Sequence, residues 1–157
     1  WEPAPSTSVT CAKSDLYISF FVGPQLDTVL DSACAAMMPT CAYPPEDMIC
    51  TQQLEWPLDG PKSTVQSANV VKEGNKQSKY QVKFSVTPAT PTPAPENLNM
   101  TLTSQVQWTT EDCYGYFALI LANAEPDGCF NSQGSGIGSA KVGGSENLKD
   151  AVFDVQI

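Results

Sequence analysis

The sequence contains no histidine and no arginine, and these absences limit the chemistry available to the protein. Without histidine, neither a serine–histidine nor a cysteine–histidine nucleophile system can be assembled. A zinc site would then need four cysteine thiolates, and the chain has no C-x-x-C pair to supply them. We therefore expect no metal, no other cofactor and no enzymatic activity.

Positive charge is scarce as well. Seventeen Asp and Glu residues oppose eight lysines, which leaves a net charge of −9. Such a chain repels the phosphate backbone of nucleic acids and the surface of anionic membranes. No apolar run approaches the roughly 20 residues that a helix needs to span a bilayer. We expect neither a nucleic-acid partner nor a membrane span.

What the chain does contain is six cysteines, an even set that favours disulfide bonds in an oxidising compartment. Six cysteines allow about fifteen connectivities, and the sequence leaves the choice among them open. Asn99-Met100-Thr101 is an N-glycosylation sequon, which fits a secreted, extracellular glycoprotein. The cysteines are Cys11, Cys34, Cys41, Cys50, Cys113 and Cys129.

Two segments carry the period of an amphipathic helix. Apolar residues from Leu26 to Met38 recur three and four positions apart, and Pro39 stops the pattern because proline cannot continue the helical hydrogen bonds. A second such run extends from Cys113 to Ala124. Before it, Thr109 to Asp112 supply a capping hydroxyl and carboxylates for the positive end of the helix.

Alternating apolar and polar residues predict the strands. A proline-rich segment from Pro88 to Glu96 predicts an extended connector. The glycines from Gly134 to Gly144 lack the strand and helix that flank a phosphate-binding loop, so we interpret them as a flexible hairpin connection. The predicted strands cover residues 16–22, 49–56, 65–71, 80–86, 100–108 and 153–157.

This order of elements predicts an α+β fold, in which two helices pack on one face of a largely antiparallel sheet. Its expected form is a split βαβ, ferredoxin-like arrangement, stapled by disulfides. We expect residues 1–157 to form a single α/β-sandwich domain. Its pseudo-repeat halves, 9–87 and 98–157, each carry a strand that leads into a helix, and the connector 88–97 joins them.

The last third of the chain carries a motif. It reads D-C-Y-G-Y-F-A-L-I-L, then P-D-G-C, then K-V-G-G-S, and closes on F-D-V-Q-I. This run resembles modules of small secreted fungal cysteine-rich proteins, in which a D-C-x-x-x-F-x-x-I helix precedes a cysteine, a K-x-G-G segment and a final strand. The matching residues are Asp112, Cys113, Phe117, Ile120, Cys129, Lys141, Gly143 and Gly144.

The arrangement of elements in that family looks like the α/β sandwich of the KP6-type killer toxins. The resemblance implies secretion by a fungus and a role in interaction or virulence, and it transfers no catalytic residue. The family often has a further cysteine before the last strand, where this chain has Asp150-Ala151-Val152. A different bridging scheme is therefore open to this protein.

Several carboxylates invite a catalytic reading but have simpler explanations. Glu111 and Asp112 suit a helix N-terminus, and the other pairs fall in polar turns. Asp27 and Asp31 lie one helical turn apart and either help to hold a cation or are solvated like charges. The pairs weighed for glycoside cleavage are Glu46/Asp47, Glu55/Asp59, Glu111/Asp112 and Glu125/Asp127.

Aromatic residues are the better candidates for contacts with a partner. Trp56, Trp108, Tyr114 and Tyr43 would form a docking or sugar-stacking patch if they are exposed. Trp108, like Tyr116, falls on a periodic apolar face, which predicts a place in the core. Trp56 beside turn residues and Tyr114 off the helix stripe are therefore the predicted partner-binding residues.

The leading interpretation is a secreted fungal effector or binding protein without catalytic activity, which acts on a host or cell-surface protein or glycan. One alternative is a killer-type toxin, although the acidic charge disfavours attraction to anionic lipids. The other alternative is a structural protein of the cell wall that associates with glycans.

Overall fold

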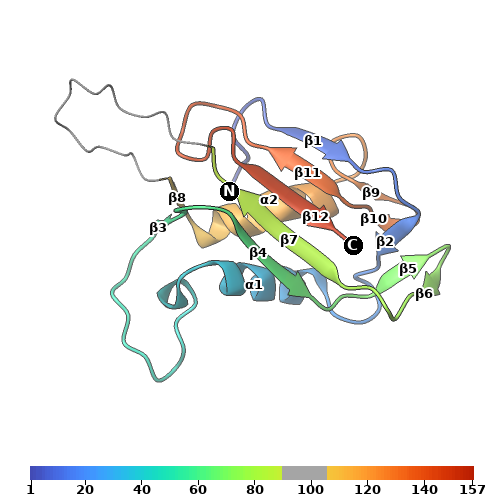
Figure 1. The fold of residues 1–157 in the computed structure, drawn as a ribbon, viewed down its shortest axis with the longest axis horizontal. Coiled ribbons are helices and arrows are strands. Elements are labelled where there is room, and N and C mark those ends of the chain that lie inside the picture. Colours follow the sequence, from blue (N-terminus) through green and yellow to red (C-terminus); the bar gives the residue numbers. More distant parts are fainter. Residues whose placement is uncertain (90–105) are drawn as a thin grey trace.

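The computed structural model describes residues 1–89 and 106–157, and in them the chain forms an α+β fold with two α-helices and antiparallel sheets (Figure 1). The predicted fold class is confirmed at this level. The Asn99 sequon and most of the proline-rich connector lie outside the described residues.

The main sheet has the order β1-β11-β12-β7-β4, and all of its strand pairs are antiparallel. The C-terminal strand β12 therefore lies at the centre, where it pairs with β11 on one side and β7 on the other. The strands are β1 (Ser8–Cys11), β4 (Lys62–Gln66), β7 (Val82–Thr87), β11 (Gly138–Lys141) and β12 (Val152–Gln156).

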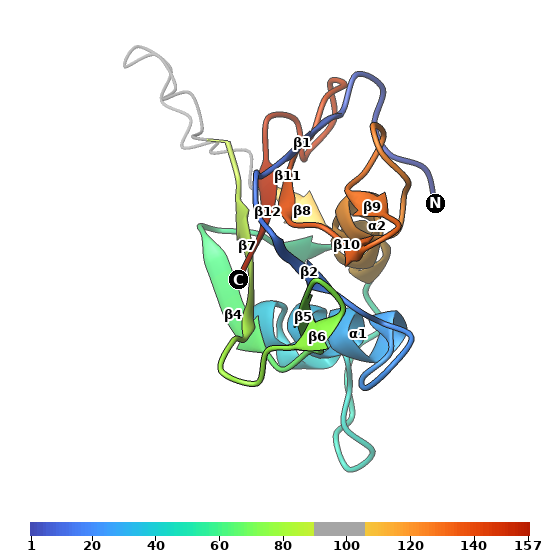
Figure 2. The same ribbon diagram turned by 90° about the vertical axis from the view of Figure 1, so that its right-hand side faces the viewer.

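The two helices, α1 (Leu26–Met37) and α2 (Thr110–Leu121), cover one face of the main sheet (Figure 2). Their buried residues follow the predicted stripes, and α1 ends two residues before Pro39 as expected. At the start of α2, the Thr109 hydroxyl accepts a hydrogen bond from the Asp112 amide at 2.9 Å. The Asp112 carboxylate in turn accepts one from the Thr109 amide at 3.0 Å, which completes a capping box.

The strand β12 separates β7 from β11, and both of these run antiparallel to it. The strands β7 and β11 are therefore parallel to each other, and α2 lies in the connection between them. Strands from both predicted halves of the chain thus pair within one sheet. The ferredoxin-like or KP6-like order and the pseudo-repeat stay predictions.

A second sheet lies at the end of the helix layer where α1 begins and α2 ends (Figure 1). The prediction of a flexible connection after Cys129 is wrong at two glycines, because Gly134 belongs to a strand of this second sheet and Gly138 belongs to β11 of the main sheet. A Cβ at Gly138 would clash with the Thr10 carbonyl oxygen, so glycine here permits close strand approach. The order is β6 (Asn75–Lys76), β5 (Val70–Lys72), β2 (Leu16–Ile18), β10 (Gly134–Ser135) and β9 (Phe130–Asn131).

A two-stranded ribbon joins β3 (Trp56–Pro57) to β8 (Gln107–Trp108), and Trp56 pairs directly with Trp108. The predicted strand 49–56 is therefore wrong over 49–55, which form no strand. Most of the predicted strand 100–108 lies outside the described residues. Ile49 and Leu54 are instead exposed apolar residues with no strand partner to cover them.

All six cysteines pair, and the structure selects one of the connectivities that the sequence left open. Cys34–Cys113 joins α1 to α2 within the core. Cys11–Cys129 connects the end of β1 to the residue before β9. Cys41–Cys50 closes a short loop after the 3₁₀ turn Thr40–Ala42.

The core between sheet and helices centres on Phe153 of β12, which is fully buried. Its ring stacks on Tyr116 at 4.9 Å between centroids and meets Phe117 edge-on at 5.2 Å. Trp108 adds a tilted contact at 6.1 Å. The predicted core positions of Trp108 and Tyr116 are confirmed, with exposed fractions of 1% and 3%. In the described residues no helix is long and apolar enough to cross a bilayer.

Candidate binding cleft beside the second helix

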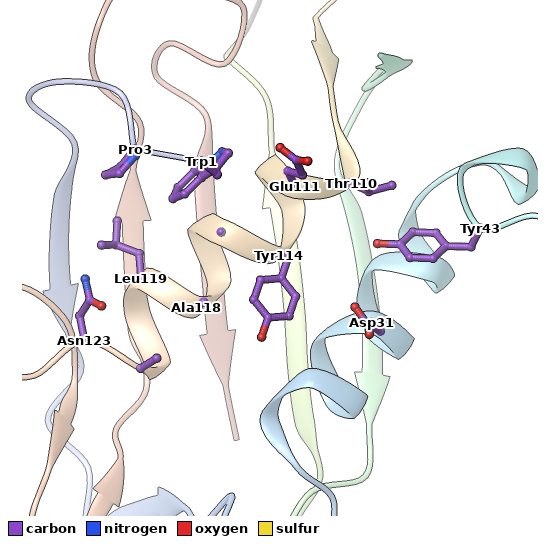
Figure 3. Close-up of a pocket in the computed structure, with 12 residues that line it drawn as sticks. Trp1, Pro3, Asp31, Tyr43, Thr110, Glu111, Tyr114, Ala118, Leu119 and Asn123 are labelled. Carbon is purple, nitrogen blue, oxygen red and sulfur yellow. The ribbon is translucent and has the colours of Figure 1, made fainter. Parts of the chain in front are cut away.

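A cavity of about 640 Å³ opens beside α2, on the side of the helices that faces away from the main sheet (Figure 3). The outward face of α2 forms its floor. The N-terminal segment forms one wall, and residues from α1 and the turn after it form the other. We call this cavity the helix cleft, defined by Trp1, Asp31, Tyr43, Glu111, Tyr114 and Ala118.

Trp1 forms the first wall because its indole docks on α2. The indole Nε1 donates a hydrogen bond to Asp112 Oδ1 at 2.9 Å, and the ring meets Tyr116 edge-on at 4.8 Å. Gly115 makes room for the ring, since a Cβ there would lie 2.6 Å from the indole. Half of the Trp1 surface stays exposed, at 50%. Trp1 was not predicted as a site residue. The one signal for it in the sequence is Gly115, because a glycine inside an apolar helix indicates close packing.

Tyr114 extends from α2 toward α1. Its hydroxyl links the two helices, because it donates a hydrogen bond to Asp27 on α1. Burial raises the pKa of Tyr114 to about 12, supported by the bond to Asp27 and by the charges of Asp27 and Asp31. Burial also raises the pKa of Tyr43, with the Asp31 charge adding to it. The negative charges of α1 therefore contribute to the raised pKa of both phenols.

The helix layer carries acidic residues without lysines to balance them. α1 contains Asp27 and Asp31, α2 contains Glu111 and Asp112, and neither helix contains a lysine. No lysine lines the helix cleft. The ion pairs found in residues 1–89 and 106–157, Lys62–Asp59 and Lys72–Asp15, use none of these four carboxylates. The cleft is thus an acidic and aromatic surface.

The two predicted partner-binding residues differ in their burial and in their position relative to the helix cleft. Tyr114 is half-buried and lines the helix cleft. Trp56 is only 7% exposed, and its backbone pairs with Trp108 in the β3–β8 ribbon. It presents little surface to a partner, and its contact role stays a prediction. Tyr43 and Asp31, which the sequence suggested only weakly, lie in the cleft with Tyr114.

In three of the four carboxylate pairs weighed for catalysis, one member has a structural partner. Asp112 belongs to the capping box and also accepts from Trp1. Asp59 pairs with Lys62, and Glu125 accepts a hydrogen bond from the Asn131 amide. Within the described part of the chain, no three His, Cys, Asp or Glu side chains gather closely enough to hold a metal ion.

A second cavity of about 500 Å³ adjoins the helix cleft at Ala122. Asp27, which accepts the Tyr114 hydrogen bond, is among its lining residues. Its other walls are apolar, with Phe20, Phe21 and Phe130. The Tyr114–Asp27 bond therefore lies between an aromatic and acidic cavity and a mainly apolar one.

We expect Tyr114 to stay protonated at pH 11, where an ordinary phenol with a pKa of about 10 is mostly ionised. Asp27→Asn removes a negative charge and weakens the acceptor, so the pKa of Tyr114 should fall toward its ordinary value. Because the raised pKa disfavours the phenolate in the folded state, this contribution to stability is complete below pH 10 and is lost as the pH rises through the folded pKa. Phenolate absorbance during an alkaline titration measures the change.

Tyr114→Phe assigns the transition, since it should remove the contribution of Tyr114 and leave that of Tyr43, whose pKa is also raised. Asp154→Asn, which removes one charge from the main sheet, serves as the matched control and should leave the titration of Tyr114 unchanged. A Tyr114 transition near pH 10 in the unmodified protein would show that Tyr114 is neither buried nor bonded to Asp27 in solution as it is in the structure.

A scan against protein-family models, a search of curated proteins and a search of solved structures found no match for this chain.

Proposed function

We propose that the protein is a secreted fungal binding protein or effector without catalytic activity, which engages a host or cell-surface partner through the helix cleft. The observation that carries the proposal is the composition of the cleft. Aromatic rings from Trp1, Tyr43 and Tyr114 surround a cavity whose charged side chains, Asp31 and Glu111, are both carboxylates. Rings of this kind supply much of the binding energy at protein interfaces.

The site is also preorganised for binding. Cys34–Cys113 joins the two helices directly beneath the cleft. Cys113 precedes Tyr114 in α2, and Cys34 lies one turn after Asp31 in α1. A covalent link at this place limits the motion of both walls, which lowers the ordering cost that a binding partner must offset.

Other features support a non-catalytic role outside the cell. The chain has no histidine to serve as a general base. Asp112 of α2 is engaged in the capping box. Three disulfides in so small a fold are compatible with an extracellular compartment. The KP6-like sandwich suggested by the sequence motif belongs to the same proposal.

The test blocks the cleft without removing a core side chain. Ala118 is half-buried in α2 and lines the cavity, so Ala118→Arg should fill it. Thr87→Arg adds the same charge at an exposed position of β7 and is the matched control. Labelled proteins are incubated with insoluble chitin, with insoluble β-glucan and with plant cells, and retention is measured.

We expect saturable retention on at least one of these surfaces, lost in Ala118→Arg and kept in Thr87→Arg. Circular dichroism confirms that both variants are folded. Equal retention of the two variants would contradict a role for the cleft. Release of soluble sugar from either polymer would contradict the non-catalytic assignment.

A further inference from the structure

We propose that the helix cleft binds a lysine or arginine side chain presented by a basic segment of the partner. This inference rests on the proposed function and names the chemistry of its ligand. It begins with Asp27 and Asp31, which lie one turn apart on the same helix. Asp31 lines the cleft, whereas Asp27 accepts the Tyr114 hydrogen bond, and neither helix contains a lysine to pair with them.

The aromatic rings around these charges suit an organic cation. Figure 3 shows Asp31 between Tyr43 and Tyr114, with the Tyr43 hydroxyl directed toward the floor of the cleft. Trp1 stands on the other side of α2 with half of its surface free. A positive group over the face of Trp or Tyr is attracted by the ring, and more strongly where water is partly excluded.

Other ligand classes fit these groups less well. A metal ion needs several close ligands, and the described residues offer no group of three. A neutral sugar would use the rings and would donate hydroxyl hydrogen bonds to the carboxylates, but it would leave their negative charge uncompensated. The carboxylates only accept hydrogen bonds, and the Tyr114 hydroxyl already donates to Asp27. The ligand that completes the cleft is therefore a positively charged donor.

Charge complementarity extends beyond a single side chain. Glu111 lines the cleft with Asp31, and the whole protein carries a net charge of −9. Such a field attracts a basic segment and accelerates its association. Burial raises the pKa of Tyr43 and the Asp31 charge adds to this rise, and the same negative charge stabilises a cation placed beside it. A basic peptide segment matches both the local and the global charge.

The experiment measures binding of capped synthetic peptides by the change in intrinsic tyrosine and tryptophan fluorescence. One peptide carries three lysines spaced by serine and glycine, a second carries glutamine at the same positions, and a soluble chito-oligosaccharide is the third probe. We expect the lysine peptide alone to bind, with affinity that falls as salt rises. Asp31→Asn should weaken it about tenfold, a loss of about 1.4 kcal/mol.

Asp154→Asn removes the same charge from the main sheet and should leave the affinity unchanged. Tyr114→Phe keeps the ring and should retain binding, whereas Tyr114→Ala should lose it. Equal binding of the lysine and glutamine peptides, or unchanged affinity in Asp31→Asn, would overturn the cation assignment. So would a chito-oligosaccharide that binds in the cleft and competes for it.

These outcomes are separable from those of the proposed function. If Ala118→Arg abolishes surface retention while Asp31→Asn has no effect on retention or on peptide binding, the cleft is a binding site for another ligand. In that case only the cation assignment is wrong. If the surface retains Ala118→Arg as well as it retains Thr87→Arg, the proposed function itself is wrong.

Discussion

Replacing Phe153 by alanine should lower the free energy of unfolding by about 3–5 kcal/mol. Phe153 is fully buried in the central strand of the main sheet. Its ring contacts Tyr116, Phe117 and Trp108, so it links the sheet to α2 and to the β3–β8 ribbon. Truncation removes the transfer energy of the ring and leaves a cavity that neighbours from three elements cannot fill together.

Urea denaturation followed by fluorescence measures this loss. Phe21→Ala is the matched control, because it removes the same ring from a position that is 87% exposed. Its effect should stay within about 0.5 kcal/mol. A loss below about 1 kcal/mol for Phe153→Ala would show that the aromatic cluster is not packed in solution as described here.

Removing the Cys34–Cys113 disulfide should cost about 4–5 kcal/mol, whereas removing Cys41–Cys50 should cost about 2–3 kcal/mol. The first bridge spans 79 residues and the second only 9. In the chain-entropy account, a cross-link stabilises the fold by restricting the unfolded chain, and it does so more when the closed loop is longer.

Both pairs are replaced by alanine, and the midpoints and slopes of urea unfolding are compared under oxidising conditions. The Cys34/Cys113 variant should also lose surface retention in part, because the walls of the helix cleft are no longer linked. Equal costs for the two bridges would contradict the loop-length argument. A cost below about 1 kcal/mol for Cys34–Cys113 would indicate that packing alone holds the helices together.

Local patterns accounted for much of the fold. The period of apolar residues placed α1 and α2, and Pro39 marked the end of α1. The oxygen atoms from Thr109 to Asp112 predicted the cap that the structure contains. These features depend on neighbours within one or two turns, and such neighbours can be read from the sequence directly.

Features set by distant contacts could not be predicted in this way. Trp56 has the sequence surroundings of a surface residue, but it is buried because Trp108, far along the chain, pairs with it. Gly134 and Gly138 lie in strands because β2 and β1, which are distant in the sequence, pair with those strands. Disulfide pairing likewise required the packing of α1 on α2 to bring Cys34 and Cys113 together.

The helix cleft shows the same division. Tyr114 was identified from its place off the apolar stripe of α2. Trp1 was not among the predicted site residues, because nothing near it in the sequence reveals that Gly115 and Asp112 provide its docking site. Asp31 and Tyr43 line the cleft only because α1 packs beside α2 in the folded chain.

The most direct test of the account is oxidative footprinting of the protein bound to the surface that retains it. Hydroxyl radicals label exposed aromatic and sulfur side chains, and Trp1, Phe21 and Met48 are 50%, 87% and 46% exposed in the free protein. We expect binding to protect Trp1, Tyr43 and Tyr114 while Phe21 and Met48 stay labelled. Protection of Phe21 or Met48 with undiminished labelling of Trp1 and Tyr114 would place the binding surface elsewhere.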